Sequence, residues 1–265
     1  MTTKAMVTTN KKKRDEYDAQ DLERIPGERW ITMSNALTRA GHGLTLAEKR
    51  IVMMAVSKLD SVKTLPRNEP VKTRIYASEY ADECSVSINT AYDQLQSAAK
   101  HIYNRSITFY EAAYKRNGGA VEPTRTTMRW VGQIQYQQGE GWVELYWWPA
   151  LMKHLVGLRK QFTSYQLQQA SALRSVYSWR LLELLTRFEA TGWAEYTIED
   201  FAVSMDASEK QKGDFAAIRR KIIEPAVKEL QDKDGWIIEW KAIKGGKKVK
   251  GIRFDFSRDP QTSLF

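Results

Sequence analysis

A predicted helix over residues 214–233 and the segment before it hold the residues whose types and spacing have the clearest chemistry. Arginine binds phosphates and the edges of guanine, lysine binds phosphates, and a small side chain lets a helix approach bases closely. This region supplies all three kinds of residue, which predicts contact with DNA. The candidate DNA-contacting residues here are Lys210, Lys212, Ala216, Arg219 and Arg220.

A second basic segment follows that helix. Residues 235–243 and 248–256 are strand-like runs on either side of Gly245 and Gly246, a pattern typical of a hairpin. No Asp or Glu occurs between Lys241 and Arg253. A basic hairpin tip suits the phosphate backbone, and each phosphate contact steepens the log–log salt dependence of binding by about 0.9. The candidate backbone-contacting residues are Lys244, Lys247, Lys248 and Lys250.

The elements that must position these side chains form a helix–turn–helix followed by the hairpin. Residues 194–198 predict a strand, residues 198–205 a helix, and residues 206–213 a polar link to the long helix. This order is that of a DNA-binding module in which the last helix enters the major groove.

The long helix has an apolar stripe that sets its orientation. The stripe consists of Phe215, Ile218, Ile222 and Leu230. It predicts that Ala217, Arg220, Lys221 and Glu224 point away from the core, with Arg219 at the border. Pro225 lies inside the helix and is expected to kink it.

The same order of elements occurs in the first half of the chain. Thr45 and Glu48 are spaced as a capping box at the start of a helix over residues 44–59. Further elements are predicted as a strand over residues 72–76, helices over 77–84 and 88–102, and wing strands over 105–114, 124–136 and 141–148, with Asn117–Gly119 as a turn. The repetition indicates an internal duplication. We therefore predict an α+β fold of two tandem winged-helix domains.

The first-half helix over residues 88–102 begins with Ser87, Asn89 and Thr90. These side chains can bind DNA, but the helix is poor in positive charge and Asp93 lies near its start. We therefore expect them to position the DNA backbone rather than to distinguish bases.

The domain boundaries follow from this repeat. We expect a disordered basic N-terminal tail over residues 1–29, a first winged-helix domain over 30–147, a second over 148–256 and a C-terminal tail over 257–265. No acidic residue lies between Leu145 and Leu182, so this junction is a further candidate for lining DNA. Its basic residues include Lys153, Arg159, Lys160, Arg174 and Arg180.

Composition excludes several classes of function. The 265 residues carry a formal net charge of +9, which favours a polyanionic partner such as nucleic acid. Cys84 is the single cysteine and the three histidines are isolated, so neither a Cys-based zinc site nor a metal-dependent nicking site is expected. No phosphate-binding loop, signal peptide or membrane span is evident. We predict a cytoplasmic, non-enzymatic protein with no catalytic residue, cofactor or metal.

Four segments resemble the iteron-binding plasmid replication initiators, the family often called Rep superfamily 3. The strongest match is FTSYQL at residues 162–167 followed by SVYSWRLLELLTRF at residues 175–188. LTLAEKR at residues 44–50 and DFAAIRRKIIEPAVKEL at residues 214–230 add support. The resemblance covers about residues 30 to 256.

The resemblance implies a monomer that binds direct repeats, or iterons, of double-stranded DNA at a plasmid origin. The second domain is expected to recognise bases and the first to bind the neighbouring backbone. It also implies a homodimer, joined through the first domain, that represses the initiator's own promoter at an inverted repeat. The implied host partners are the host initiator, the replicative helicase and the sliding clamp, and the sequence leaves open whether chaperones dissociate the dimer.

The last five residues, QTSLF, resemble the pentapeptide by which bacterial proteins bind the sliding clamp. Gln261, Leu264 and Phe265 occupy the matching positions.

The alternative function is that of a winged-helix transcription regulator without replication activity. Composition does not separate the two classes. Repeated sites of 18 to 22 base pairs beside the gene would favour the initiator, because a pair of domains spans about two helical turns.

Overall fold

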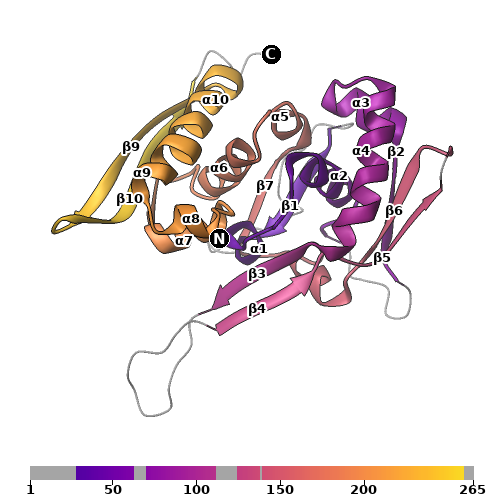
Figure 1. Ribbon diagram of the computed structural model, residues 1–265, viewed down its shortest axis with the longest axis horizontal. Helices are drawn as coiled ribbons and strands as arrows, with labels where there is room; N and C mark the ends of the chain where they lie inside the picture. The colour runs from indigo at the N-terminus through magenta and orange to yellow at the C-terminus, as the bar shows by residue number, and fades with distance from the viewer. Residues whose placement is uncertain (1–27, 63–69, 112–123, 138, 260–265) are drawn as a thin grey trace, which may run out of the picture.

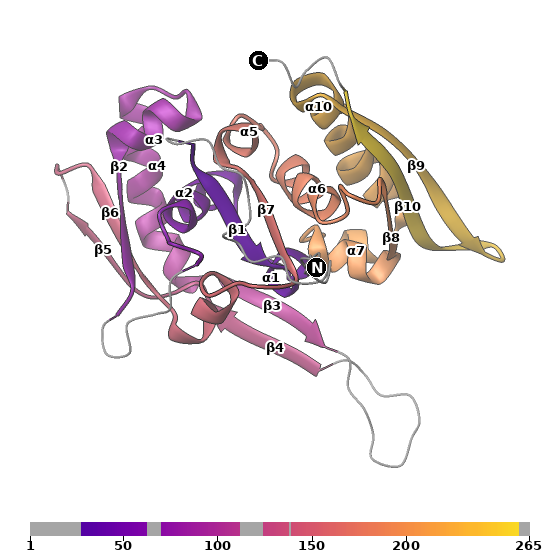
Figure 2. The same cartoon turned by 180° about the vertical axis from the view of Figure 1, so that it is seen from behind.

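The computed structural model describes residues 28–62, 70–111, 124–137 and 139–259. Helices α7–α10 with strands β8–β10 form one lobe, and helices α3 and α4 with strands β2, β5 and β6 form the opposite one (Figure 1). Between these two outer parts lie α2 and β1, which belong to the first lobe, and α5, α6 and β7 from the middle of the chain, an arrangement that the reverse view also shows (Figure 2). The turn expected at Asn117–Gly119 lies outside the described residues, and so does the expected tail over residues 1–29 except for its last two residues.

The first lobe contains the predicted helix–turn–helix. Its elements are β1 (Trp30–Ser34), α1 (Asn35–Arg39), α2 (Leu46–Ser57), β2 (Lys72–Tyr76), α3 (Ala77–Cys84), α4 (Ile88–His101) and the short 3-10 helix η2 (Ile102–Asn104). The capping box is present: the Thr45 side chain accepts from the Glu48 N–H, and the Glu48 carboxylate accepts from the Thr45 N–H. Cys84 is buried, as expected of a cysteine that fills the core.

The strands of the first lobe differ from the expected three-stranded wing. They are β3 (Ser106–Glu111), β4 (Thr124–Arg129), β5 (Val131–Gln137) and β6 (Trp142–Trp147). The run predicted as one strand over residues 124–136 divides at Trp130, which is fully buried and donates from its indole N–H to the His42 carbonyl at 2.9 Å. This anchor separates two sheets, a hairpin of β3 with β4 and a sheet ordered β2-β6-β5.

The middle of the chain crosses between the lobes. Its elements are the 3-10 helix η3 (Pro149–His154), β7 (Phe162–Gln166), α5 (Leu167–Ser171) and α6 (Val176–Thr186). β7 pairs antiparallel with β1, so that Trp30 lies opposite Gln166 and Ser34 opposite Phe162. Helix α6 is buried along most of its length and contributes to the common core.

The second lobe repeats the order of the first. Its elements are β8 (Trp193–Thr197), α7 (Ile198–Ser204), α8 (Glu209–Lys212), α9 (Phe215–Ile218), the π-helical turn η4 (Arg219–Ile223), α10 (Glu224–Asp234), β9 (Trp236–Gly245) and β10 (Lys248–Arg258). The three strands form an antiparallel sheet ordered β8-β10-β9. Both lobes therefore have the helix–turn–helix and hairpin that the repeated sequence pattern predicts.

Candidate nucleic-acid interface

The long helix of the second lobe begins at a defined cap and is anchored by its apolar side. The Asp214 carboxylate accepts from the Ala217 N–H at 3.1 Å and so satisfies one of the free donors at the helix start. Ile218, Ile222 and Leu230 are completely buried, which fixes the direction of the opposite side. That side faces solvent, as the predicted stripe requires.

The irregularity expected at Pro225 takes the form of a π-helical turn one step earlier in the chain. Residues 219–223 form η4, and the Glu224 N–H bonds to the Arg219 carbonyl, five positions back. Proline lacks an N–H and cannot continue the regular ladder, and such turns often occur at functional sites. The wider turn changes the phase of the helix. Independently of this turn, which begins two residues later, the prediction that Ala217 is turned outward is wrong, because Ala217 is buried.

The exposed side of α9 and η4 is basic. Ala216, Arg219, Arg220 and Lys221 are all exposed. Arg219 forms an ion pair of 3.3 Å with Glu224, but both side chains are half exposed, so the pair is weak and a phosphate can replace the carboxylate. Lys221 was not among the predicted contacts. It lies beside Arg220 and forms no ion pair with any described residue.

The residues before the helix are less uniform. Lys210 is exposed, whereas Lys212 is partly buried and forms an ion pair of 2.6 Å with Glu209. Lys212 also lines a shallow pocket together with Arg125 of β4. Arg125 therefore brings a cation from the first lobe to the turn between the helices of the second helix–turn–helix, a long-range proximity that no local pattern in the sequence indicates.

The hairpin of β9 and β10 presents its lysines at the tip. Gly246 has a φ of +68°, the left-handed conformation that favours glycine in a tight turn. Lys244, Lys247, Lys248 and Lys250 are exposed and form no ion pair with the described part of the chain. Lys250 lies so close over Gly245 that a Cβ there would fall 2.4 Å from its Cδ.

The base of the hairpin is electrically different from its tip. Arg253 forms ion pairs with Asp255 at 2.7 Å and with Glu195 at 3.0 Å, and Lys241 lies 3.9 Å from Asp255. The hydrogen bond from Arg253 holds the pKa of Asp255 below its ordinary value, so this carboxylate is charged at neutral pH. The absence of acids between residues 241 and 253 therefore overstates the positive charge at the base.

In the first lobe, the side chains at the start of α4 serve partly as a cap. The Ser87 hydroxyl accepts from the Thr90 N–H at 3.1 Å and lies 2.8 Å from the Thr90 hydroxyl. Asn89 is exposed, and Ile88 beside it is 45% exposed. Residues 87–93 contain no basic side chain and Asp93 is exposed, in agreement with the low positive charge of the sequence here.

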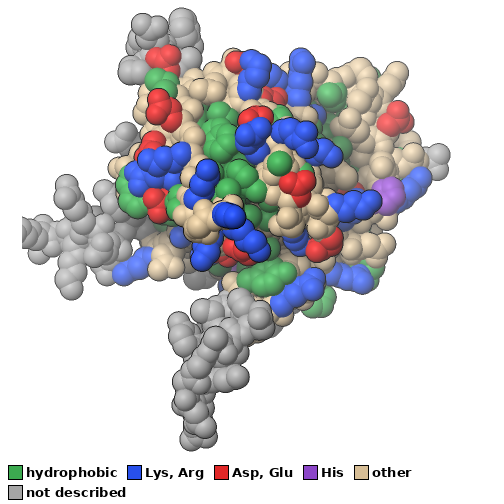
Figure 3. All heavy atoms as spheres, turned by 60° about the vertical axis from the view of Figure 1, so that its left-hand side comes forward, with side chains coloured by type: hydrophobic (Ala, Val, Ile, Leu, Met, Phe, Trp, Pro, Cys, Tyr) green, Lys and Arg blue, Asp and Glu red, His purple; other side chains and the backbone are tan. Residues whose placement is uncertain are grey.

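The structure does not gather the two sets of candidate residues into one cluster. Helix α4 and the helix of α9, η4 and α10 lie in opposite lobes (Figure 1). Lys and Arg side chains spread over the molecule's face in Figure 3, with acidic side chains between them. Two separated helices of this kind suit two separated segments of one duplex.

The comparison with family models decides the family. The model described as Initiator Replication protein, WH1, matches residues 30–186, and the model described as Initiator Rep protein, WH2, matches residues 197–256. The chain belongs to the initiator replication protein family. The predicted α+β fold of two tandem winged-helix domains is confirmed.

Relatives of this initiator span nearly its whole length. An uncharacterized 27.6 kDa protein of Escherichia coli is 23% identical over 226 residues, covering 82% of this chain and 91% of that protein. The PI protein of Escherichia coli is 23% identical over 257 residues, covering 86% and 83%. The crystal structure of the Pi initiator protein in complex with iteron DNA matches with a TM-score of 0.69 at 19% identity, covering 89% of this chain and all of that one.

One residue of the acid-free junction does not reach the protein surface. Lys153, Arg159, Lys160 and Arg174 are exposed, but Arg180 is completely buried. The expectation that Arg180 lines DNA is wrong, because its guanidinium is enclosed by carbonyls and by Glu183.

Neither a metal centre nor a membrane-spanning helix is found among the described residues of the initiator. No group of His, Cys, Asp or Glu side chains there has the geometry to hold a metal ion. No helix in that part of the chain is long and apolar enough to cross a membrane.

Proposed function

We propose that this protein initiates plasmid replication by binding direct repeats of double-stranded DNA at the origin as a monomer. The helix of α9 and η4 recognises bases in a major groove, the lysine-tipped hairpin binds the adjacent backbone, and α4 positions the first lobe on the same duplex. The observation that carries this proposal is the exposed run Arg219–Lys221 on a capped, core-anchored helix in a chain of the initiator family.

The charges of the second lobe support this division of roles. Arginine on a helix in the major groove can bind two acceptors of a guanine at once, and the exposed Ala216 leaves room for the helix to approach. The hairpin lysines are point charges without carboxylate partners among the described residues, and they suit phosphates of any sequence. The Pi initiator protein, whose fold is similar, was crystallised in complex with iteron DNA.

The test is a nuclease footprint of the purified protein on the DNA that flanks its own gene. We expect protected direct repeats of about two helical turns each. The double variant Arg219→Ala with Arg220→Ala should lose sequence-selective protection while it retains salt-sensitive binding to any duplex. Lys228→Ala is the matched control, because Lys228 is 76% exposed on α10 and forms an ion pair with Asp232.

The outcomes of the footprint are distinct. Selective protection by the double variant would contradict base recognition by this helix. Protection of a single inverted repeat with no direct repeats would favour the transcription regulator instead.

The same proposal includes self-association and host partners. A dimer joined through the first domain represses the protein's own promoter at an inverted repeat, and the DNA-bound monomer binds the host initiator and the replicative helicase. Acting by binding, the protein needs no catalytic centre. Sedimentation with direct-repeat and with inverted-repeat DNA should give one and two protein chains per site, and equal stoichiometry would refute the switch.

The C-terminal residues Gln261, Leu264 and Phe265 lie outside the described residues, and we propose them as a docking peptide for the sliding clamp. Deletion of residues 261–265 should abolish clamp capture and leave the footprint unchanged. Clamp capture that survives the deletion would refute this role.

A further inference from the structure

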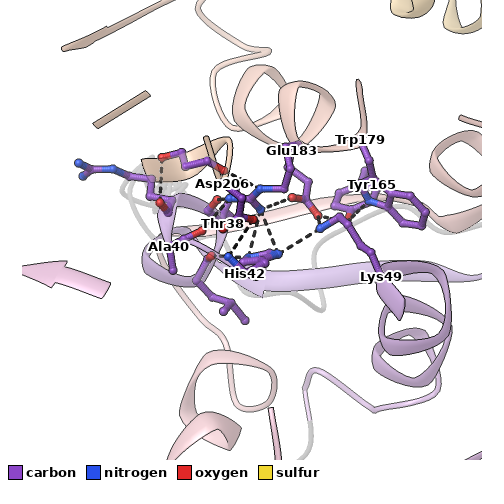
Figure 4. A network of polar contacts seen from close by, with 12 residues as sticks. Thr38, Ala40, His42, Lys49, Tyr165, Trp179, Glu183 and Asp206 are labelled. Atoms are coloured by element: carbon purple, nitrogen blue, oxygen red, sulfur yellow. Dashed lines mark hydrogen bonds and ion pairs between the residues drawn. The ribbon is translucent and has the colours of Figure 1, made fainter. Parts of the chain in front are cut away.

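The end of α1 and the residues that follow it, 38–43 of the first lobe, are held by side chains from the middle of the chain and from the second lobe (Figure 4). Arg180 of α6 makes the largest share of these contacts. Its Nη2 donates to the carbonyls of Thr38 and Ala40, both at 2.8 Å, and its Nε donates to the Ser204 carbonyl of α7 at 2.7 Å. One buried guanidinium therefore joins the backbones of both lobes.

The charge of Arg180 is balanced inside the same core. Its Nη1 forms an ion pair with Glu183, whose other oxygen accepts from Lys49 at 2.8 Å and from the Tyr165 hydroxyl at 2.6 Å. The side chains of Arg180, Glu183 and Lys49 have no exposed surface. Every charge here has a partner, which a buried charged network requires if it is to stabilise one arrangement.

Asp206 provides a second connection at the edge of the network. Its Oδ2 accepts from the His42 N–H and its Oδ1 from the Gly43 N–H, each at 3.1 Å. Its backbone has a φ of +51°, an unusual conformation for a residue with a side chain. The Ser204 hydroxyl, two residues earlier, donates to the Arg39 carbonyl at 2.8 Å.

These contacts differ from an ordinary apolar domain interface. Apolar surfaces remain in contact when they slide, whereas hydrogen bonds to fixed carbonyl and N–H groups are lost within a small displacement. If α6 moved away from α2, Lys49 would also lose its ion pair with Glu183 and remain buried without it, which is strongly unfavourable, whereas the Arg180–Glu183 pair lies within α6 and would be kept. The network thus favours one angle between the lobes.

We propose that Arg180 and Asp206 are positioning residues for DNA recognition: they fix the angle between the two winged-helix lobes and so the spacing between the two helices that meet the duplex. Only the effect of the angle on DNA recognition rests on the proposed function. The angle itself is a property of the free protein and is measured separately.

The first experiment measures that angle without DNA. Spin labels on Lys100→Cys of α4 and Lys228→Cys of α10 report the distance between the lobes, since both residues are exposed. Cys84 does not compete for the label, because it is buried and burial raises the pKa of its thiol to about 11. Diluted into excess unlabelled protein, so that a dimer contains at most one labelled chain, the full-length protein should give one narrow distance distribution.

Asp206→Ala is the informative variant, because it removes both contacts to residues 42 and 43 and leaves the charged core in place. We expect a clearly broader distance distribution, with partial recovery in Asp206→Asn, which keeps one strong acceptor. Asp200→Ala is the matched control: Asp200 lies 3.7 Å from Arg39 across the same lobes, but both side chains are about half exposed. A distribution for Asp206→Ala as narrow as that of the control would overturn the proposal.

The second experiment uses the footprinted site. Asp206→Ala should bind the intact site about tenfold or more weakly, because the loss of even one of its two charge-assisted hydrogen bonds is worth about tenfold, and should bind a half-site as the unaltered protein does. It should also discriminate less against sites with two to four inserted base pairs. If the unaltered protein binds no such site, the proposed function fails, and the label distances still decide the inference about the angle.

Arg180→Met is the stronger variant and serves as a second test. Should it fail to fold, Asp206→Ala decides alone. Should it fold and keep both the narrow distance and the spacing preference, Arg180 has no positioning role.

Discussion

The four lysines at the hairpin tip allow a quantitative prediction. Lys244, Lys247, Lys248 and Lys250 are exposed and have no carboxylate partner among the described residues, so each is free to neutralise one phosphate. Changing all four to Gln should lower the slope of log affinity against log salt by about 3.6, because each contact contributes about 0.9. Between 50 and 200 mM salt, the unaltered protein should then lose about 150-fold more affinity than the variant.

The assay is fluorescence anisotropy with a labelled duplex at several salt concentrations, for a specific site and for an unrelated sequence. Both affinities should fall together, because phosphate contacts carry no sequence information. Lys228→Gln is the control, since its exposed side chain forms an ion pair with Asp232 on the same helix. An unchanged slope, or a loss confined to the specific site, would refute the role of the tip.

Three further predictions concern single residues. Ala216→Glu on the exposed side of α9 should change the free energy of unfolding, measured by urea titration, by less than about 0.5 kcal/mol. It should lower the affinity for the specific site, measured by anisotropy, at least about tenfold. Unchanged affinity would exclude close approach of this helix to bases. Glu183→Ala leaves Arg180 and Lys49 buried without their carboxylate and should cost about 3–5 kcal/mol in urea unfolding, whereas a loss below about 1 kcal/mol would contradict the network. Burial and the nearby charges of Arg180 and Lys49 hold the pKa of His42 well below its ordinary value, so as the pH falls the unfolded chain takes up a proton near pH 6.5, before the folded protein does. The melting temperature should therefore fall as the pH drops from about 7 to 5. If His42→Asn shows the same decrease in melting temperature over this range, His42 is not its cause.

Elements set by local signals were predictable from the sequence. Thr45 of the predicted capping box is the N-cap of α2, which begins at the next residue, Leu46. Ser87, in the expected turn, is the N-cap of α4. The exposure of Arg219 and Arg220 follows from the apolar stripe on the opposite side of the helix. These features depend on residues within one or two turns, which periodicity and caps report directly.

Features set by distant parts of the chain were not predictable. Arg180 lies in a stretch without acids, and nothing in that stretch reveals that its guanidinium meets carbonyls some 140 positions earlier. Trp130 interrupts a strand-like run because its indole N–H bonds to His42 in another segment. The π-helical turn η4 changes the phase of the helix after Ile218, an effect that a uniform helical period cannot represent.

The DNA contacts of the candidate residues remain predictions. The domain boundary between residues 147 and 148 is likewise still a prediction. The first family model extends to residue 186, and β7 pairs with β1, so both observations associate residues beyond 148 with the first domain.

That pairing has a consequence for synthesis of the chain. Thr32 of β1 meets Ser164 of β7 across 132 positions, so at about 5–20 residues per second the nascent strand waits roughly 7 to 25 s for its partner to be translated. During this time Ile31 and Met33, fully buried in the finished protein, remain on an open strand edge. Chains that terminate before residue 162 therefore keep an unpaired, apolar strand edge, and they should aggregate rather than form a folded fragment.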